Sequence, residues 1–199
     1  ATPLQCYYLQ SLLATQQKSL AFKKIATLWL EVNSPPSVCR KVFARWEQSG
    51  GLTSDLIWKK LDQAMTKNNV TVIQHVARFL PPAQRLQVKR WYQVQRHPLL
   101  IERSHQFDPD NTIDRKILLF GMKRLANKDP IALAEDWPQL TRAYDLNEAE
   151  RQPILADLAV SLARRGHSAA GDWLNKIKPA YANVTLREWR VRNSLLNGQ

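Results

Sequence analysis

Glycine is scarce in this sequence, with 6 among 199 residues, which argues against a turn-rich all-β fold. Long hydrophobic runs are also missing, and no stretch approaches the roughly 18 apolar residues that a membrane-spanning helix needs. No segment shows a sustained alternation of apolar and polar residues, the pattern of a half-buried strand. Since 44% of the residues are hydrophobic and 23% are charged, the composition is that of an ordinary globular protein.

The sequence motifs of several enzyme classes are missing too. No glycine-rich phosphate loop and no HExxH metal motif occur in the chain. Glu102, Ser104 and His105 bring acid, hydroxyl and imidazole together, but neighbours in sequence rarely have the geometry of a catalytic triad. Glu135 and Asp136 occupy successive helix positions, where side chains point about 100° apart. We therefore expect no catalytic residue, no cofactor and no metal ion in this chain.

Acidic residues are in deficit, with 17 Asp and Glu against 29 Lys and Arg and a formal net charge of +12. Such an excess favours an anionic partner: nucleic acid, anionic lipid, or a polymer that carries carboxylates. The basic residues come mostly as scattered pairs, such as Lys59-Lys60 and Arg115-Lys116, and no segment has four in a row. Ordinary solvated helix faces explain such pairs, and an anion-binding surface is the alternative.

Helical periodicity recurs along nearly the whole chain. Cys39, Val42, Phe43 and Trp46 have the i, i+3, i+4, i+7 spacing that gathers side chains on one helix face. Pro35-Pro36 before this face and Gly50-Gly51 after it are typical start and stop signals. Similar spacings predict further helices around residues 6–13, 22–29, 57–65, 73–80, 86–91, 118–125, 133–144, 155–162, 173–177 and 186–189. Leu86 and Trp91 mark the apolar face of one of them, which His97-Pro98 should end.

Local signals mark where several of these helices begin and end. Asp129-Pro130 opens one helix, in which Pro138 predicts a kink, and Asn147 with Glu150 forms a capping-box pattern before the next. Connections this short make sequential helices antiparallel, and hairpins stacked in order curve into a superhelix. We therefore predict an all-α fold, a right-handed α-α superhelix of irregular stacked hairpins, in a single domain over residues 1–199.

The two cysteines, Cys6 and Cys39, lie 33 positions apart on the apolar faces of different predicted helices. Three interpretations are open: free thiols packed as small hydrophobic side chains, metal ligands, or a disulfide between the first and third helices. Metal binding lacks support, because none of the four histidines has a close ligand spacing.

The chain has seven tryptophans, and six of them lie on the apolar stripes of predicted helices. We interpret these six as core side chains, and stacking on a sugar is the alternative. Trp58 lies one place beyond its stripe, so we expect it to be the most exposed. The six are Trp29, Trp46, Trp91, Trp137, Trp173 and Trp189.

One set of residues in the first quarter of the chain forms a recognisable pattern: Gln5-Cys6, Tyr7-Tyr8, Leu28-Trp29, Ser34-Pro35-Pro36, Cys39, Phe43, Trp46 and Ser49-Gly50. This pattern resembles the N-terminal superhelical region of the soluble lytic murein transglycosylases. The resemblance is dense over residues 4–50, fades beyond residue 80 and returns weakly at residues 188–190. Members of that family pair the two matching cysteines, so the resemblance implies a Cys6–Cys39 disulfide and a periplasmic location.

These enzymes are peptidoglycan lyases that cleave glycan strands to 1,6-anhydromuramoyl products with one catalytic glutamic acid. That residue lies in a Glu-Ser context, followed by Gly-Leu-Met-Gln and Ala-Tyr-Asn-x-Gly, and this chain has none of the three segments. The resemblance thus implies a scaffold that guides cell-wall glycan strands, without the lysozyme-like catalytic domain. Because the chain begins at Ala1 and not at Met, we expect it to be part of a longer protein.

Two functions from other classes remain as alternatives. A tetratricopeptide-like solenoid would bind a peptide in a concave groove, although the signature of that repeat is absent. A basic helical-repeat protein would bind nucleic acid with strong salt dependence and would have no use for a disulfide. We expect glycan strands as the partner, with no nucleic acid and no membrane span.

Overall fold

The computed structural model of this chain describes residues 2–15 and 17–196. These residues form eleven α-helices and three short 3-10 helices, and they contain no strand. The all-α prediction is therefore confirmed. None of the helices in these two ranges is long and apolar enough to cross a membrane. The contacts divide the chain into two compact units, residues 1–88 and 89–199, which we call unit 1 and unit 2 and describe separately.

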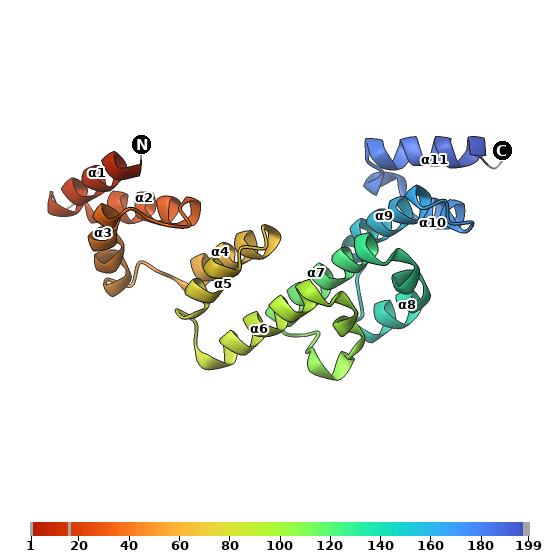
Figure 1. The fold of residues 1–199 in the computed structure, drawn as a ribbon, viewed down its shortest axis with the longest axis horizontal. Helices are drawn as coiled ribbons and strands as arrows, with labels where there is room; N and C mark the ends of the chain where they lie inside the picture. The colour runs from red at the N-terminus through yellow and green to blue at the C-terminus, as the bar shows by residue number, and fades with distance from the viewer. Residues whose placement is uncertain (1, 16, 197–199) are drawn as a thin grey trace. The chain divides into compact units, whose positions relative to one another are not determined.

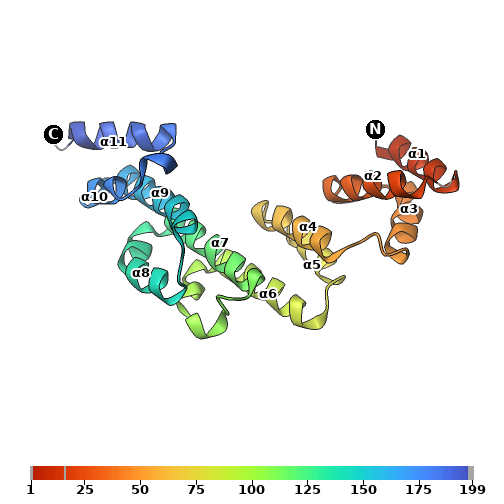
Figure 2. The same ribbon diagram turned by 180° about the vertical axis from the view of Figure 1, so that it is seen from behind.

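Unit 1 holds five helices and the first half of a sixth, coloured red to yellow in Figures 1 and 2. The first helix packs against the second and third, while the fourth and fifth form a hairpin that lies side by side in both views. The elements are α1 (Thr2–Ala14), α2 (Lys18–Glu31), α3 (Ser37–Gln48), α4 (Ser54–Thr66), α5 (Val70–Ala77) and α6 (Pro82–Arg96).

The end of α3 shows how local sequence sets this packing. Gly50 adopts a φ of 75°, the left-handed conformation that glycine accepts most easily at a helix C-terminus. The next residue, Gly51, lies against the ring of Trp46, so an added Cβ would fall 2.1 Å from it. Trp46 is buried and packs on Trp29 of α2, with ring centroids 6.1 Å apart. The Gly-Gly stop signal therefore also makes room for the unit's largest fully buried side chain.

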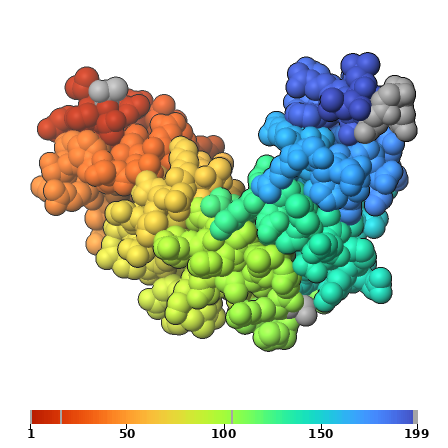
Figure 3. All heavy atoms as spheres, turned by 45° about the vertical axis from the view of Figure 1, so that its right-hand side comes forward, coloured from red at the N-terminus to blue at the C-terminus, as the bar shows by residue number. Residues whose placement is uncertain are grey.

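Unit 2 is built around α7, which packs along α9, with α8 against both. The unit continues through α10 and α11 to the blue end of the ribbon, and side chains fill the spaces between its helices in the space-filling view (Figure 3). Its elements after α6 are η1 (Pro98–Glu102), η2 (Ser104–Gln106), α7 (Thr112–Lys128), α8 (Pro130–Ala143), α9 (Glu148–Arg164), α10 (Ala170–Asn175), η3 (Pro179–Tyr181) and α11 (Val184–Leu196).

Close approach of α7 to the preceding segment depends on Gly121. A Cβ at this position would lie 2.5 Å from Ile101 and 2.7 Å from Val94, two fully buried side chains. Tyr144, at the end of α8, reaches the same place and donates a hydrogen bond from its hydroxyl to the Ile101 carbonyl at 2.5 Å. Burial raises the pKa of Tyr144 to about 12.

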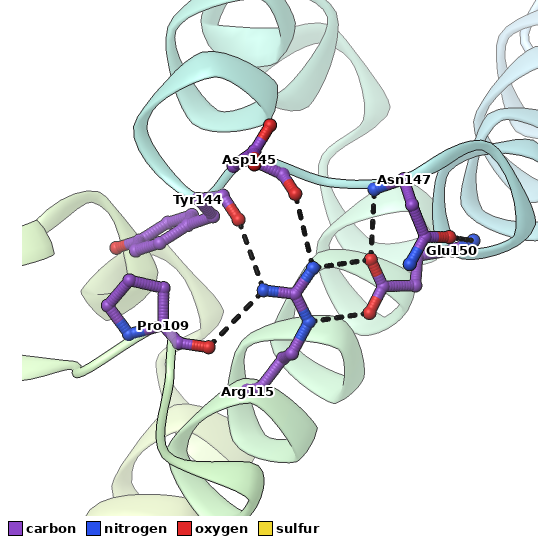
Figure 4. A network of polar contacts seen from close by, with 6 residues as sticks. All are labelled: Pro109, Arg115, Tyr144, Asp145, Asn147 and Glu150. Carbon is purple, nitrogen blue, oxygen red and sulfur yellow. Dashed lines mark hydrogen bonds and ion pairs between the residues drawn. The ribbon is translucent and has the colours of Figure 1, made fainter.

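One arginine joins the three principal helices of unit 2 (Figure 4). The Arg115 guanidinium, on α7, donates two hydrogen bonds of 2.6 Å to the Glu150 carboxylate of α9. Its remaining N–H groups donate to the carbonyls of Pro109, Tyr144 and Asp145, at 3.2 to 3.3 Å. An arginine has five N–H donors, so all five are used. We call this cluster the Arg115 hub, and its charge is balanced within the fold.

The helix ends predicted from the sequence are mostly confirmed, but the buried face of one helix, α6, is predicted wrongly. The Asn147–Glu150 capping box is present, and α6 ends at Arg96, before His97-Pro98. α8 continues through Pro138. In α6, however, Leu86 is 64% exposed, and the buried apolar positions are Val88, Trp91 and Val94. The prediction that Leu86 faces the core is therefore wrong, because the buried stripe of α6 begins at Val88 instead.

Candidate functional site

The disulfide implied by the family resemblance is present. Cys6 of α1 and Cys39 of α3 are fully buried, and their sulfur atoms are bonded at 2.03 Å. Neither cysteine is left as a free thiol or a metal ligand. The bond joins the first helix to the third across 33 positions, and the apolar faces predicted for the two helices meet around it.

Of the acid, hydroxyl and imidazole at Glu102, Ser104 and His105, the side chain of Ser104 lies outside the described residues. Glu102 is exposed and interacts with Asp136 of α8. Partial burial, a hydrogen bond with Asp136 and its charge all raise the pKa of Glu102. The structure thus pairs this glutamate with one member of the Glu135-Asp136 dipeptide.

A groove of about 500 Å³ runs between α3 and α5 in unit 1. Trp29, Phe43, Val72, Val76 and Phe79 supply its apolar walls. We call it the α3–α5 groove. Its size is within the usual range for sites that bind small molecules or short segments of chain. Polar groups come from the connection between α2 and α3 and from α5, namely Asn33, Ser34 and Thr71, with the charged or titratable side chains of Arg40, Glu47, Lys60 and His75.

Lys60 is the most unusual of these residues, because its side chain is a buried cation with only 4% of the residue exposed. Its Nζ donates to the Leu30 carbonyl at 2.8 Å and to the Val32 carbonyl at 3.1 Å, at the C-terminus of α2. It also lies 5.8 Å from the ring centroid of Trp29. Burial first, and then the charge of Lys67, lower the pKa of Lys60 to about 8.

Two other titratable groups of the groove have shifted pKa values. Burial raises the pKa of Glu47 on α3. The pKa of His75 on α5 is lowered by partial burial and by the charge of Arg78, whose guanidinium contacts the His75 ring. The His75 ring also packs edge-on against Phe79, with centroids 5.8 Å apart. Three perturbed groups at one apolar groove make it the best candidate for a binding site in unit 1.

Lys60 is not singled out by the sequence, because it belongs to the scattered basic pairs that are expected on solvated helix faces. A signal was present, because Lys60 lies three residues after Ile57 and four before Ala64, on the apolar stripe of α4. Its neighbour Lys59 is exposed, as expected for a solvated helix face.

The tryptophan predictions hold for half of the set. Trp29, Trp46 and Trp91 are buried in the core. Trp58 is half-buried, and Trp137, Trp173 and Trp189 are also only half-buried although they lie on predicted stripes. Trp137 and Trp173 pack edge to face, with ring centroids 6.2 Å apart, and Lys176 lies 3.9 Å from the Trp173 centroid. Pairs of this kind stabilise helix contacts while leaving part of each ring in solvent.

Comparison with protein families gives one match, to the family described as Cucumovirus coat protein, over residues 9–110. The described residues in this range form α-helices and 3-10 helices and contain no strand. Viral capsid domains are typically jelly rolls of eight β-strands. Because the secondary structure of the matched residues disagrees with that architecture, we do not assign the chain to this family. No curated protein matches the sequence.

Solved structures agree with the helical fold along the entire chain. The X-ray structure of an inactive mutant of the lytic transglycosylase Slt from Pseudomonas aeruginosa matches with a TM-score of 0.75 and 28% identity. The match covers 100% of this chain and 32% of that one. The 70-kDa soluble lytic transglycosylase from Escherichia coli matches with a TM-score of 0.65 at 20% identity. A complex of the 70-kDa soluble lytic transglycosylase with bulgecin A gives 0.66, also at 20%.

The matched chains are much longer than this one, which spans 38% of the two 70-kDa enzyme chains. The matches at 20% identity show a shared fold alone. The Pseudomonas structure is 28% identical to this chain over the whole length of this chain. With the disulfide in place between the two cysteines that carry the resemblance, fold and sequence agree. This chain therefore has the all-helical superhelical fold of the soluble lytic transglycosylases and is related to them.

Proposed function

We propose that this chain is the superhelical, substrate-guiding part of a lytic transglycosylase that acts on peptidoglycan in the periplasm. The observation that carries the proposal is the full-length match to the Pseudomonas lytic transglycosylase, at a TM-score of 0.75 and 28% identity. In this proposal the chain itself is not catalytic, and cleavage of the glycan strand belongs to another part of the same protein.

Two properties of the chain support the location and the substrate. A buried disulfide is typical of proteins that fold in an oxidising compartment such as the bacterial periplasm. The net charge of +12 attracts a polymer that carries carboxylates, as peptidoglycan does on its stem peptides. Attraction of this kind raises the local concentration of the strand without requiring a specific site for each sugar.

Cosedimentation of the purified chain with peptidoglycan sacculi tests the guiding role. We expect binding that weakens as salt is raised, because exposed charges are screened beyond about 8 Å at physiological ionic strength. Chitin, a neutral glycan without stem peptides, is the matched control and should bind less. Equal binding to both polymers, or none to sacculi, would contradict the proposal.

The non-catalytic part of the proposal needs a separate measurement. Sacculi incubated with the chain should release no 1,6-anhydromuramoyl fragments by liquid chromatography and mass spectrometry. An active lytic transglycosylase added to the same sacculi is the positive control. Release by this chain alone would contradict the proposed division of labour, whatever the outcome of the binding assay.

A further inference from the structure

The α3–α5 groove contains a buried positive charge that no carboxylate of the described residues neutralises. Lys60 has three N–H donors, and two of them are used by the Leu30 and Val32 carbonyls. Neither contact is an ion pair. A buried ammonium is costly unless a counter-ion or hydrogen bonds compensate it, and the lowered pKa of Lys60 reflects that incomplete compensation. An anion in the groove would supply the missing partner.

Other charged groups of the groove add to a positive field. Arg40 lies exposed on α3 at the same groove, so cations line it from two helices. The one carboxyl group among the lining residues is Glu47, and burial raises its pKa. With two cations against this one carboxyl group, the lining favours an occupant that carries a negative charge.

The apolar side chains in the walls of the groove favour an occupant that is itself largely apolar. Trp29 and Phe43 are buried, but Phe79 is 39% exposed and forms an uncovered apolar edge. Asn33, Ser34 and Thr71 bring amide and hydroxyl groups to the same opening, and all three are exposed. An apolar side chain next to peptide groups satisfies both kinds of lining, whereas a plain hydrocarbon chain would leave the polar groups unused.

We propose that the α3–α5 groove binds the C-terminal end of an apolar peptide, with the free carboxylate paired to Lys60 and Arg40. The terminal apolar side chain lies against Phe79, Val76 and Phe43, and the preceding peptide group faces Asn33 and Thr71. The site is independent of the guiding role, since the groove lies entirely within residues 29–79 of unit 1.

Two synthetic peptides test the carboxylate directly: N-acetyl-Ala-Leu with a free C-terminus, and the same peptide as its carboxamide. Titration calorimetry on the intact chain should give a dissociation constant at least about tenfold lower for the carboxylate, the value expected for one charge-assisted contact. Lys60→Met should remove this preference, while Lys59→Met, its exposed neighbour on α4, should retain it. Circular dichroism checks that each variant is folded.

Two further variants keep the test decisive if Lys60→Met fails to fold. Arg40 is exposed, so Arg40→Gln should leave the fold intact and reduce the preference for the carboxylate severalfold. Glu47→Gln removes the opposing charge and should tighten binding of the carboxylate peptide severalfold. Unchanged constants in both variants would overturn the proposal.

A third ligand distinguishes a peptide end from an acyl chain. Octanoate carries the same carboxylate on a hydrocarbon body without peptide groups, and we expect it to bind more weakly than the peptide. Tighter binding of octanoate would overturn the assignment to a peptide. Binding of the peptide and its carboxamide with equal affinity would overturn the role of Lys60, and binding of none of the three would overturn the site.

Discussion

The two units of this chain hold a buried or half-buried cation in different ways. In unit 2, Arg115 makes five hydrogen bonds and an ion pair with Glu150, so its donors and its charge are both satisfied. In unit 1, Lys60 is more deeply buried, yet it donates to two carbonyls and faces the Trp29 ring, with no carboxylate of the described residues paired to it. The unit that lacks an internal ion pair for its cation is the one whose helices are joined by a disulfide.

This difference separates a structural charge from a candidate binding charge. A fully hydrogen-bonded arginine fixes the relative position of three helices and has no capacity left for a ligand. A buried lysine with a spare donor weakens the fold around it, and the disulfide between α1 and α3 offsets that cost within the same unit.

Removal of the disulfide is expected to have the largest effect. Replacing Cys6 and Cys39 together by Ala should lower the free energy of unfolding of unit 1 by about 3 to 4 kcal/mol, because a closed loop of this length limits the entropy of the unfolded chain. Peptide-level hydrogen exchange should show faster exchange in α1–α3 and little change in α7–α9. Equal acceleration in both units would show that the disulfide does not act locally.

The Arg115 hub should give the next largest effect, this time in unit 2. Glu150→Gln leaves the half-buried Arg115 without its carboxylate and should cost about 2 to 3 kcal/mol, somewhat less than for a fully buried pair. Glu148→Gln is the matched control on the same turn of α9, since its ion pair with Lys178 is exposed and should contribute less than about 1 kcal/mol. Urea unfolding of the two variants, followed by circular dichroism, measures both values. Similar losses would mean that the hub is no stronger than a surface pair.

The sequence predicted those features of both units that depend on neighbouring residues. The bounds of α3 follow from Pro35-Pro36 and Gly50-Gly51, and the structure places the helix at Ser37–Gln48 with Gly50 left-handed. The capping box at Asn147 and Glu150 was predictable for the same reason. Signals of this kind act over three or four residues, so a single sequence contains them completely.

Features that depend on contacts between residues far apart in the chain could not be predicted from the sequence. Nothing near Arg115 indicates that Glu150, 35 positions later, completes its hydrogen bonds. Leu86 belongs to a helix whose buried face is set by the helices packed on it, and apolarity alone gave the wrong orientation. Lys60 was partly predictable. Its position on the apolar stripe of α4 can be read from the sequence, whereas its hydrogen bonds to the carbonyls of Leu30 and Val32 cannot. The disulfide followed from the family resemblance and not from spacing.

Acid should change the contributions of Glu150 in unit 2 and Glu47 in unit 1 in opposite directions, with an effect bounded by that of Glu150→Gln. The hydrogen bonds from Arg115 lower the pKa of Glu150, so its contribution is present above the ordinary glutamate range and is lost as pH falls through the folded-state value. Burial raises the pKa of Glu47, so the folded state takes up a proton first, and this group adds stability to unit 1 as pH falls toward the ordinary range.

Comparing each Gln variant with wild type by hydrogen exchange at the same pH isolates its group. Intrinsic exchange rates and the pKa shifts of His75, Glu102 and Asp157 are the same in both proteins and cancel. Near neutral pH, Glu47→Gln should slow hydrogen exchange in α3 relative to wild type, and the difference should disappear in acid. Glu150→Gln should speed hydrogen exchange in α9 near neutral pH, and this difference should also disappear in acid. The same pH dependence for both variants would mean that the two units do not differ in how they hold their charges.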